Sequence, residues 1–188
     1  MKKVSIAVSD LQAVLTALEE GKISIKDILT LINKENDQVK KDSEEMITLT
    51  VDYSRTLKQM IADGKYDWKN ENITEKNFPI PEEVKGKKVE ISTKLFHFNR
   101  DISSEDAKKE MDKDGFRPAT LFEQQAFAQK HPELQRQFPI VALGSVWQRT
   151  LGYRLVPCLD VDDVERRLGL FWLVRGWRAY YRFLAVRK

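Results

Sequence analysis

Residues 166–188 constrain the fold of this chain more than any other stretch. They read RRLGLFWLVRGWRAYYRFLAVRK, in which two apolar runs typical of β-strands are separated by residues 175–179. Gly176 lies in this connection, and glycine readily adopts the positive φ that tight hairpin loops require. We therefore predict that the two runs form a C-terminal β-hairpin.

Alternation along the first run predicts which side chains face outward, because successive residues of a strand point to opposite faces. We expect one face to fill a core, and it carries Leu168, Leu170 and Trp172. The other face and the residues near it are Gly169, Phe171, Leu173, Val174, Tyr180 and Tyr181. This second set would expose more apolar surface than a hairpin normally shows, which favours a binding role. The alternative is that Phe171 and Leu173 pack beneath the N-terminal helices.

The composition is that of a globular protein, since 41% of the 188 residues are hydrophobic. No apolar run approaches the roughly 18 residues of a membrane-spanning helix, and the first residues lack the long apolar segment of a secretory signal. We therefore expect a cytoplasmic protein. Cys158 is the only cysteine, which excludes an internal disulfide and a cysteine metal cluster. The histidines, His97 and His131, stand alone and predict no metal site, and no glycine-rich phosphate loop indicates a cofactor.

Residues 1–45 are interpreted as a separate N-terminal helical hairpin. Residues 10–20 place apolar side chains at helical spacing, with Ser9 as the predicted N-cap and Gly21 as the stop. A second helix is predicted after Ser24, and residues 33–45 are polar enough to be a solvated helical tail or a linker. The apolar stripe of such a hairpin leaves three arrangements open: self-association, docking on the following domain, or packing within its own domain.

Residues 46–188 predict a single α+β domain with helices on one side of a mainly antiparallel sheet. Strand patterns precede the C-terminal hairpin at 46–52, 88–98, 138–147 and 153–160. Helical patterns occupy 54–66, 102–116 and 117–132. The last two helices carry cap patterns, Ser103 with Asp106 and Thr120 with Glu123.

Arginine takes the place of lysine in the C-terminal part of this domain. From residue 149 onward nine basic residues stand against four acidic ones, a local charge of +5, whereas the whole chain carries +3. No lysine occurs between Lys130 and Lys188. This segment therefore has a different role, or a different history, from the rest of the chain.

Several segments together resemble the variable proteins of diversity-generating retroelements. They are GFRPATLFEQQAFAQKHPELQRQFPIVALGSVWQ, RLVPCLD, the LxLxW pattern that ends at Trp172, then Trp177 and the ending RFLAVRK. The resemblance spans about residues 46–188, and its most specific parts are GFRPAT and the C-terminal segment with its tryptophans. It implies a C-type lectin fold of the formylglycine-generating-enzyme type.

In that family a reverse transcriptase copies a template repeat with errors at adenines. Asparagine codons of the AAY type thereby change to many others in a hypervariable region, which here is about residues 149–188. The implied fixed framework is Leu168, Leu170, Trp172, Trp177, Arg182 and Phe183. The implied varied, ligand-binding face is Gly169, Phe171, Leu173, Val174, Arg175, Arg178, Ala179, Tyr180 and Tyr181, with Tyr153 and Leu155 as additional candidates. Such errors cannot produce Lys, Glu, Gln, Met or Trp, and none of these occurs in the varied set.

A diversified face needs a scaffold that tolerates arbitrary side chains. Surface substitutions away from special features usually change stability by about 0.5 kcal/mol or less, and Tyr and Arg are typical of binding hot spots. The resemblance therefore implies a non-enzymatic protein that binds a protein or another macromolecular ligand. Activity of the parent enzyme fold would need a cysteine pair for copper, whereas this chain has Cys158 alone. The acidic run DVDDVE fails as an EF-hand, because Glu165 and Phe171 stand where Gly and Glu are required.

Nucleic-acid binding by the C-terminal hairpin is the alternative function. Arginine and aromatic residues interleave in RGWRAYYR, and such surfaces stack bases and neutralise phosphates. The local charge of +5 is modest for that role. The two functions differ in salt dependence, because binding to phosphates weakens steeply as salt is added.

Overall fold

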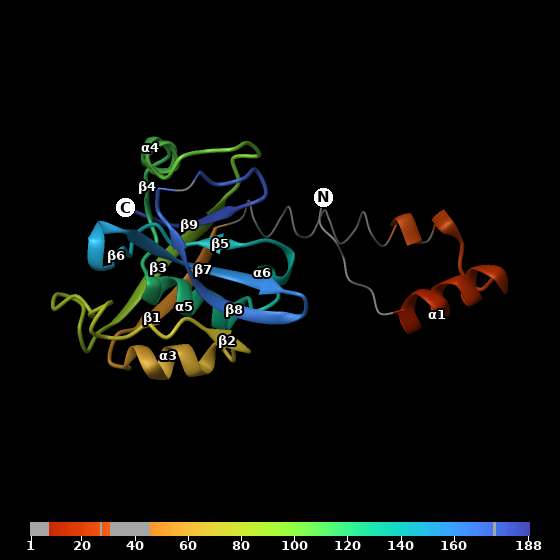
Figure 1. Ribbon diagram of the computed structural model, residues 1–188, viewed down its shortest axis with the longest axis horizontal. Coiled ribbons are helices and arrows are strands. Elements are labelled where there is room, and N and C mark those ends of the chain that lie inside the picture. The colour runs from red at the N-terminus through yellow and green to blue at the C-terminus, as the bar shows by residue number, and fades with distance from the viewer. Residues whose placement is uncertain (1–7, 27, 31–45, 175) are drawn as a thin grey trace. The chain divides into compact units, whose positions relative to one another are not determined.

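The computed structural model describes residues 8–26, 28–30, 46–174 and 176–188 (Figure 1). Contacts between residues divide the chain into two units, residues 1–42 and 43–188, and each is described by itself. The polar segment 33–45, expected to be a tail or a linker, lies outside the described residues.

Helix α1 (Val8–Glu19) ends at a glycine in the left-handed region, as predicted. Gly21 has φ 67°, the N–H of Gly21 donates to the carbonyl of Leu18 over 3.1 Å, and the N–H of Lys22 donates to that of Ala17 over 2.9 Å. These two bonds satisfy carbonyls that the helix end would otherwise leave unpaired. The described part of the helix already includes Val8, so Ser9 lies inside it and is not the predicted N-cap.

The second helical segment of this unit follows Ser24, as predicted. Residues 25–26 and 28–30 are helical, and the N–H of Ile28 donates to the carbonyl of Ser24 over 3.2 Å. Several apolar side chains of the two segments are exposed, namely Val14, Leu15, Ile25 and Leu29. The expected apolar stripe is therefore open to solvent at these positions.

Nine strands form one sheet in the described part of the second unit. They are β1 (Ile47–Asp52), β2 (Trp68–Lys69), β3 (Lys88–Phe96), β4 (Phe116–Pro118), β5 (Ile140–Val141), β6 (Trp147–Gln148), β7 (Arg154–Asp162), β8 (Glu165–Trp172) and β9 (Arg182–Arg187). The order is β1-β3-β9-β5-β7-β8-β2, with β4 also paired to β9 and β6 to β7. All pairings are antiparallel except β5 with β9 and β2 with β8.

The helices of this unit are α3 (Leu57–Asp63), α4 (Ser104–Lys113), α5 (Leu121–Lys130) and α6 (Leu134–Gln137), and a 3-10 turn, η1, covers Thr150–Gly152. Figure 1 shows α4 on one side of the sheet and α3 with α5 on the other, so the expectation that the helices share one side was wrong. The predicted class is confirmed at the coarse level, because the unit is α+β with a large, mostly antiparallel sheet.

The expected C-terminal hairpin does not form. Strand β8 pairs with β7 and β2, whereas β9 pairs with β3, β4 and β5, so β5 and β7 separate the two runs in the sheet. Residues 173–181 are therefore a crossover connection rather than a hairpin loop. Local turn signals such as Gly176 predict a change of direction but do not specify the strand that the chain pairs with next.

The hairpin that does form joins β7 to β8. Asp162 pairs with Glu165, which leaves Asp163 and Val164 as the loop, and Asp163 has φ 51°. Aspartate tolerates this left-handed conformation better than most residues. The acidic run DVDDVE thus spans the end of β7, the two-residue loop and the first residue of β8. Arg167 forms ion pairs with Asp160 over 2.9 Å and with Asp162 over 2.5 Å.

The predicted caps of α4 and α5 are confirmed. Ser103 accepts a hydrogen bond from the N–H of Asp106 over 3.0 Å. Thr120 and Glu123 form a reciprocal capping box, in which the N–H of Thr120 donates to the Glu123 carboxylate over 2.6 Å. Glu123 is buried and also accepts two bonds from the guanidinium of Arg117, over 2.6 and 3.0 Å. One carboxylate therefore caps α5 and pairs with the arginine of β4.

The core on the α4 side draws on strands that are far apart in sequence. It consists of Phe96, Ile102, Ala107, Met111, Phe116, Val141, Leu143, Val156, Cys158, Leu173, Trp177, Phe183 and Ala185. Residues of the crossover connection are thus built into this core. Within the described residues, no helix is long and apolar enough to cross a membrane.

Candidate ligand-binding surface

The residues expected to share one varied face lie on both faces of the β7–β8 hairpin. Phe171 pairs with Val156, while the next residue, Trp172, pairs with Leu155. Because neighbouring residues of a strand point to opposite faces, these two pairs face different sides of the sheet. Phe171 packs against the core on the α4 side. Phe171 and Leu155, both expected in the varied set, therefore face different sides of the sheet, and the side that carries Phe171 packs against the core on the α4 side instead of being open as predicted.

Three expected surface residues are buried. Leu173 is only 3% exposed, Leu155 is also buried, and Gly169 lies within β8 opposite Cys158. A Cβ atom at Gly169 would lie 3.0 Å from the ring of Phe171. Leu173 lies on the same side as Phe171, as the alternation predicts, but the core on the α4 side covers this side and buries Leu173. These three positions belong to the scaffold.

The remaining expected residues include a cluster that reaches the surface at the crossover connection. Val174, Arg178, Tyr180 and Tyr153 are exposed, whereas Phe171, Ala179 and Tyr181 are half-buried. Arg175 lies outside the described residues. We name one group the tyrosine surface, which consists of Phe171, Arg178, Tyr180 and Tyr181.

Aromatic stacking connects the tyrosine surface to the core. The rings of Tyr180 and Tyr181 stack with centroids 4.8 Å apart, and Tyr181 meets the edge of Trp177 at 5.3 Å. Phe171 contacts Tyr181 at 6.5 Å in an edge-on arrangement. Tyr180 is 56% exposed, and its ring packs on the half-buried Tyr181, which in turn packs on the buried Trp177.

Trp177 is the buried anchor of this stack. Its main chain forms two hydrogen bonds with Ile102, over 2.9 and 3.0 Å. Its indole N–H donates to the hydroxyl of Ser104 over 2.8 Å, and that hydroxyl donates to the carbonyl of Leu173 over 2.6 Å. This chain of bonds satisfies the polar atoms of a buried tryptophan and fixes the first residue and the middle of the connection to α4.

Two residues from the loop between β3 and α4 hold the exposed part of the connection. Asp101 accepts hydrogen bonds from the guanidinium of Arg178 over 2.8 Å and from the N–H of Ala179 over 3.1 Å. A ring nitrogen of His97, Nε2, lies 3.0 Å from the carbonyl oxygen of Ala179. Sequence patterns did not single out these contacts, because about 80 residues separate the partners and no local motif relates them.

Burial shapes the electrostatics beside the tyrosine surface. It raises the pKa of the Tyr181 hydroxyl and lowers the pKa of Arg182 to about 10. The Arg182 guanidinium donates to the carbonyl of Tyr180 over 3.1 Å and lies 4.6 Å from the centre of the Phe138 ring. Burial, followed by the positive charge of Arg182, lowers the pKa of His97. The site is therefore aromatic, and burial favours the neutral form of the Tyr181 hydroxyl.

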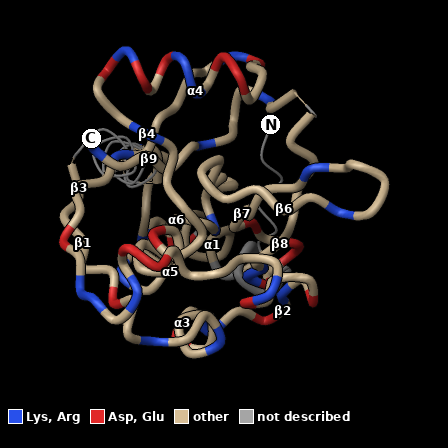
Figure 2. Tube along the Cα trace, turned by 90° about the vertical axis from the view of Figure 1, so that its left-hand side faces the viewer, with Lys and Arg blue, Asp and Glu red and all other residues tan. Residues whose placement is uncertain are grey.

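A second exposed aromatic group lies on the other face of the hairpin. Tyr153 meets Trp172 edge-on with ring centroids 4.9 Å apart, and Trp172 is 38% exposed rather than buried as expected. The reason is the short neighbour strand, since β2 covers β8 only at Arg167 and Leu168. Nearby, the loop between β6 and β7 projects from the body of the unit (Figure 2) and carries the exposed Leu151.

The other implied framework residues are more enclosed. Leu168, Trp177 and Phe183 are buried, while Leu170 and Arg182 are half-buried. Cys158 is fully enclosed, and burial raises the pKa of its thiol well above the usual value, which disfavours the reactive thiolate. Among the described residues, no group of three or more His, Cys, Asp or Glu side chains is placed to hold a metal ion.

Comparisons of this chain with protein-family models, with curated proteins and with solved structures found no match.

Proposed function

We propose that residues 46–188 form a non-enzymatic ligand-binding domain with a C-type lectin fold, as in the variable proteins of diversity-generating retroelements. The observation that carries this proposal is the exposed Tyr180 ring, stacked on Tyr181 and supported by the buried Trp177. A large aromatic side chain held in a fixed orientation loses little entropy on binding, which suits it to contact a protein.

The diversified positions are those that reach the surface. They are Tyr153, Phe171, Val174, Arg178, Ala179, Tyr180 and Tyr181. Each is an amino acid that errors at the adenines of an AAY codon can produce. Gly169, Leu173 and Leu155 are not proposed as ligand contacts, because they are buried.

Sequencing the DNA that flanks the gene tests the proposed diversification. We expect a near-identical repeat of the segment encoding residues 149–188, with AAY codons at several of the surface positions, beside a gene for a reverse transcriptase. Differences spread evenly over buried and exposed codons, or a genome without the repeat, would contradict the retroelement origin.

Binding is tested by selecting peptides from a random library against the full chain and measuring their affinity for variants. Tyr180→Ala should lower the affinity of the selected peptides by about ten-fold or more, because it removes the most exposed ring of the stack. Trp68→Ala is the matched control, since Trp68 is also an exposed aromatic residue but lies in β2. Equal losses in the two variants would contradict a binding role for the tyrosine surface.

The nucleic-acid alternative has less support at this surface. Arg178 is paired with Asp101, and basic residues are interspersed with acidic ones along the chain (Figure 2). Affinity for a generic single-stranded DNA measured at low and at physiological salt separates the two functions. We expect weak binding that disappears with salt, whereas tight binding that depends on Tyr180 and Tyr181 would favour the alternative.

A further inference from the structure

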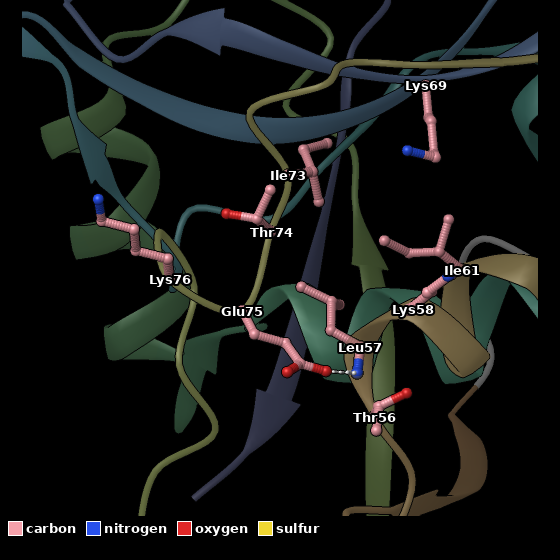
Figure 3. A pocket seen from close by; sticks show the side chains of 9 residues that line it. All are labelled: Thr56, Leu57, Lys58, Ile61, Lys69, Ile73, Thr74, Glu75 and Lys76. Atoms are coloured by element: carbon pink, nitrogen blue, oxygen red, sulfur yellow. Dashed lines mark hydrogen bonds between the residues drawn. The ribbon is translucent and has the colours of Figure 1, made fainter.

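A pocket of about 630 Å³ lies between α3 and residues 69–76, and it shares no residue with the tyrosine surface (Figure 3). Its floor is apolar and consists of Leu57 and Ile61 from α3 and Ile73 from the facing segment. All three residues are buried, with at most 7% of their surface exposed, so only a small part of each is open to the pocket. The volume falls within the roughly 300–1,000 Å³ of pockets that bind small molecules.

Hydrogen bonds hold the facing segment in place. The N–H of Asn70 donates to the carbonyl of Leu168 in β8 over 2.9 Å, and that of Ile73 donates to the carbonyl of Asn70 over 3.1 Å. The Glu75 carboxylate accepts a bond from the N–H of Leu57, at the start of α3, over 3.2 Å. The two walls are thus joined at one end, and the pocket is largely formed before anything binds.

The edge of the pocket is basic. Lys58, Lys69 and Lys76 line it and are exposed, and none of them forms an ion pair with another residue that the structure describes. Figure 3 shows the amine of Lys69 directed toward the space between Ile61 and Ile73, with Lys76 on the far side of Thr74. The single carboxylate among the lining residues, Glu75, is engaged by the main chain of α3.

We propose that this pocket binds a small organic anion that has an apolar body and one charged head. The body would lie on the floor formed by Leu57, Ile61 and Ile73, where it removes apolar surface from water. The head would lie at the edge, where lysine ammonium groups on long flexible stems can reach it while keeping contact with water. A neutral ligand would gain nothing from the lysine charges, and a cation would meet three lysines against the single carboxylate of Glu75.

Nuclear magnetic resonance of the full chain tests this proposal with three probes that share an eight-carbon body: octanoate, 1-octanol and octylammonium. Octanoate should shift the resonances of Ile61 and Ile73 in a saturable manner. Octanol should bind about ten-fold more weakly, and octylammonium should not bind at this position. A saturable octanoate shift confined to Tyr180 and Tyr181 would overturn the proposed location, as would its absence at Ile61 and Ile73 at millimolar concentration.

Charge removal then tests the role of the lysines. The triple variant K58Q/K69Q/K76Q should bind octanoate about ten-fold more weakly at low salt, because three surface attractions are lost together. The matched control is K87Q/K108Q/K109Q, which changes the net charge equally but lies outside the pocket, and it should bind as the parent does. Equal binding by the two variants, or equal binding of octanoate and octanol to the parent, would overturn the assignment of an anion.

Discussion

At the scale of single residues, the hydroxyl of Ser104 is the link between α4 and the crossover connection. It accepts the indole N–H of Trp177 and donates to the carbonyl of Leu173, and all of these groups are buried. The bonds matter chiefly because buried polar groups are costly when they are left without a partner. The stability of the tyrosine surface therefore depends on a residue that does not belong to it.

Ser104→Ala should lower the free energy of unfolding by about 1–3 kcal/mol, since it leaves the Trp177 N–H and the Leu173 carbonyl unpaired. Urea unfolding followed by tryptophan fluorescence measures the change. The control Ser54→Ala removes an exposed hydroxyl that bonds to Asp52, and it should change stability by no more than about 0.5 kcal/mol. A Ser104→Ala variant whose free energy of unfolding equals that of the parent would contradict the proposed link.

His97 gives a prediction about pH. Its pKa is lowered in the folded chain, first by burial and then by Arg182, so the unfolded chain binds more protons near pH 6. The contribution of His97 to stability is therefore fully present above its ordinary pKa of about 6.5 and is lost as pH falls through the lower folded pKa. Titration of the His97 ring by nuclear magnetic resonance should give a pKa below that of an unfolded control. A His97 pKa in the folded chain that is higher than in the unfolded control would contradict the predicted direction of the shift.

At the scale of elements, α5 depends on one carboxylate. Glu123 completes the capping box with Thr120 and accepts both bonds from Arg117. Glu123→Gln keeps the shape of the side chain but removes its charge, and it should destabilise the fold by about 1–3 kcal/mol. Thermal or urea unfolding measures the loss. Glu110→Gln, at a more exposed ion pair on α4, should change little, and equal effects of the two substitutions would contradict this role of Glu123.

The elements differ in how well the sequence predicts them, for a physical reason. The caps at Ser103 and Thr120 and the stop at Gly21 depend on residues within a few positions of each other, so the pattern contains the whole interaction. The partners of β9 are β3, β4 and β5, which are distant in sequence, and no local pattern specifies them. The prediction of a C-terminal hairpin was wrong for this reason, and the pairing β7–β8 was missed with it.

The candidate site likewise has some features that the sequence predicts and others that it does not. The aromatic and arginine content of residues 171–181 indicated a binding surface, and Tyr180 and Arg178 are indeed exposed. The exposure of Trp172 depends on where β2 ends, and the burial of Leu173 depends on which face of the sheet the core on the α4 side covers; the alternation of side chains determines neither. The pocket beside α3 was not predicted, because its floor and its lysines come from two segments that meet only in the folded chain.

At the scale of the whole molecule, the second unit has its own sheet and core. Residues 43–188 produced alone should therefore fold, with a melting temperature within a few degrees of that of the full chain. Circular dichroism and calorimetry measure this directly. Comparing the solution masses of the two proteins shows whether residues 1–42 drive self-association. A truncated chain that is unfolded would contradict the division into two units.

The central claim is that a buried scaffold, including Leu173, Trp177 and Phe183, presents changeable side chains at Val174, Arg178 and Tyr180. Two yeast-display libraries test it most directly, one randomised at the three exposed positions and the other at the three buried ones. The measurement is the fraction of members that resist thermolysin as well as the parent does. We predict that most members of the first library and few of the second will resist thermolysin, and equal loss of resistance in both libraries would contradict a buried scaffold that presents changeable side chains.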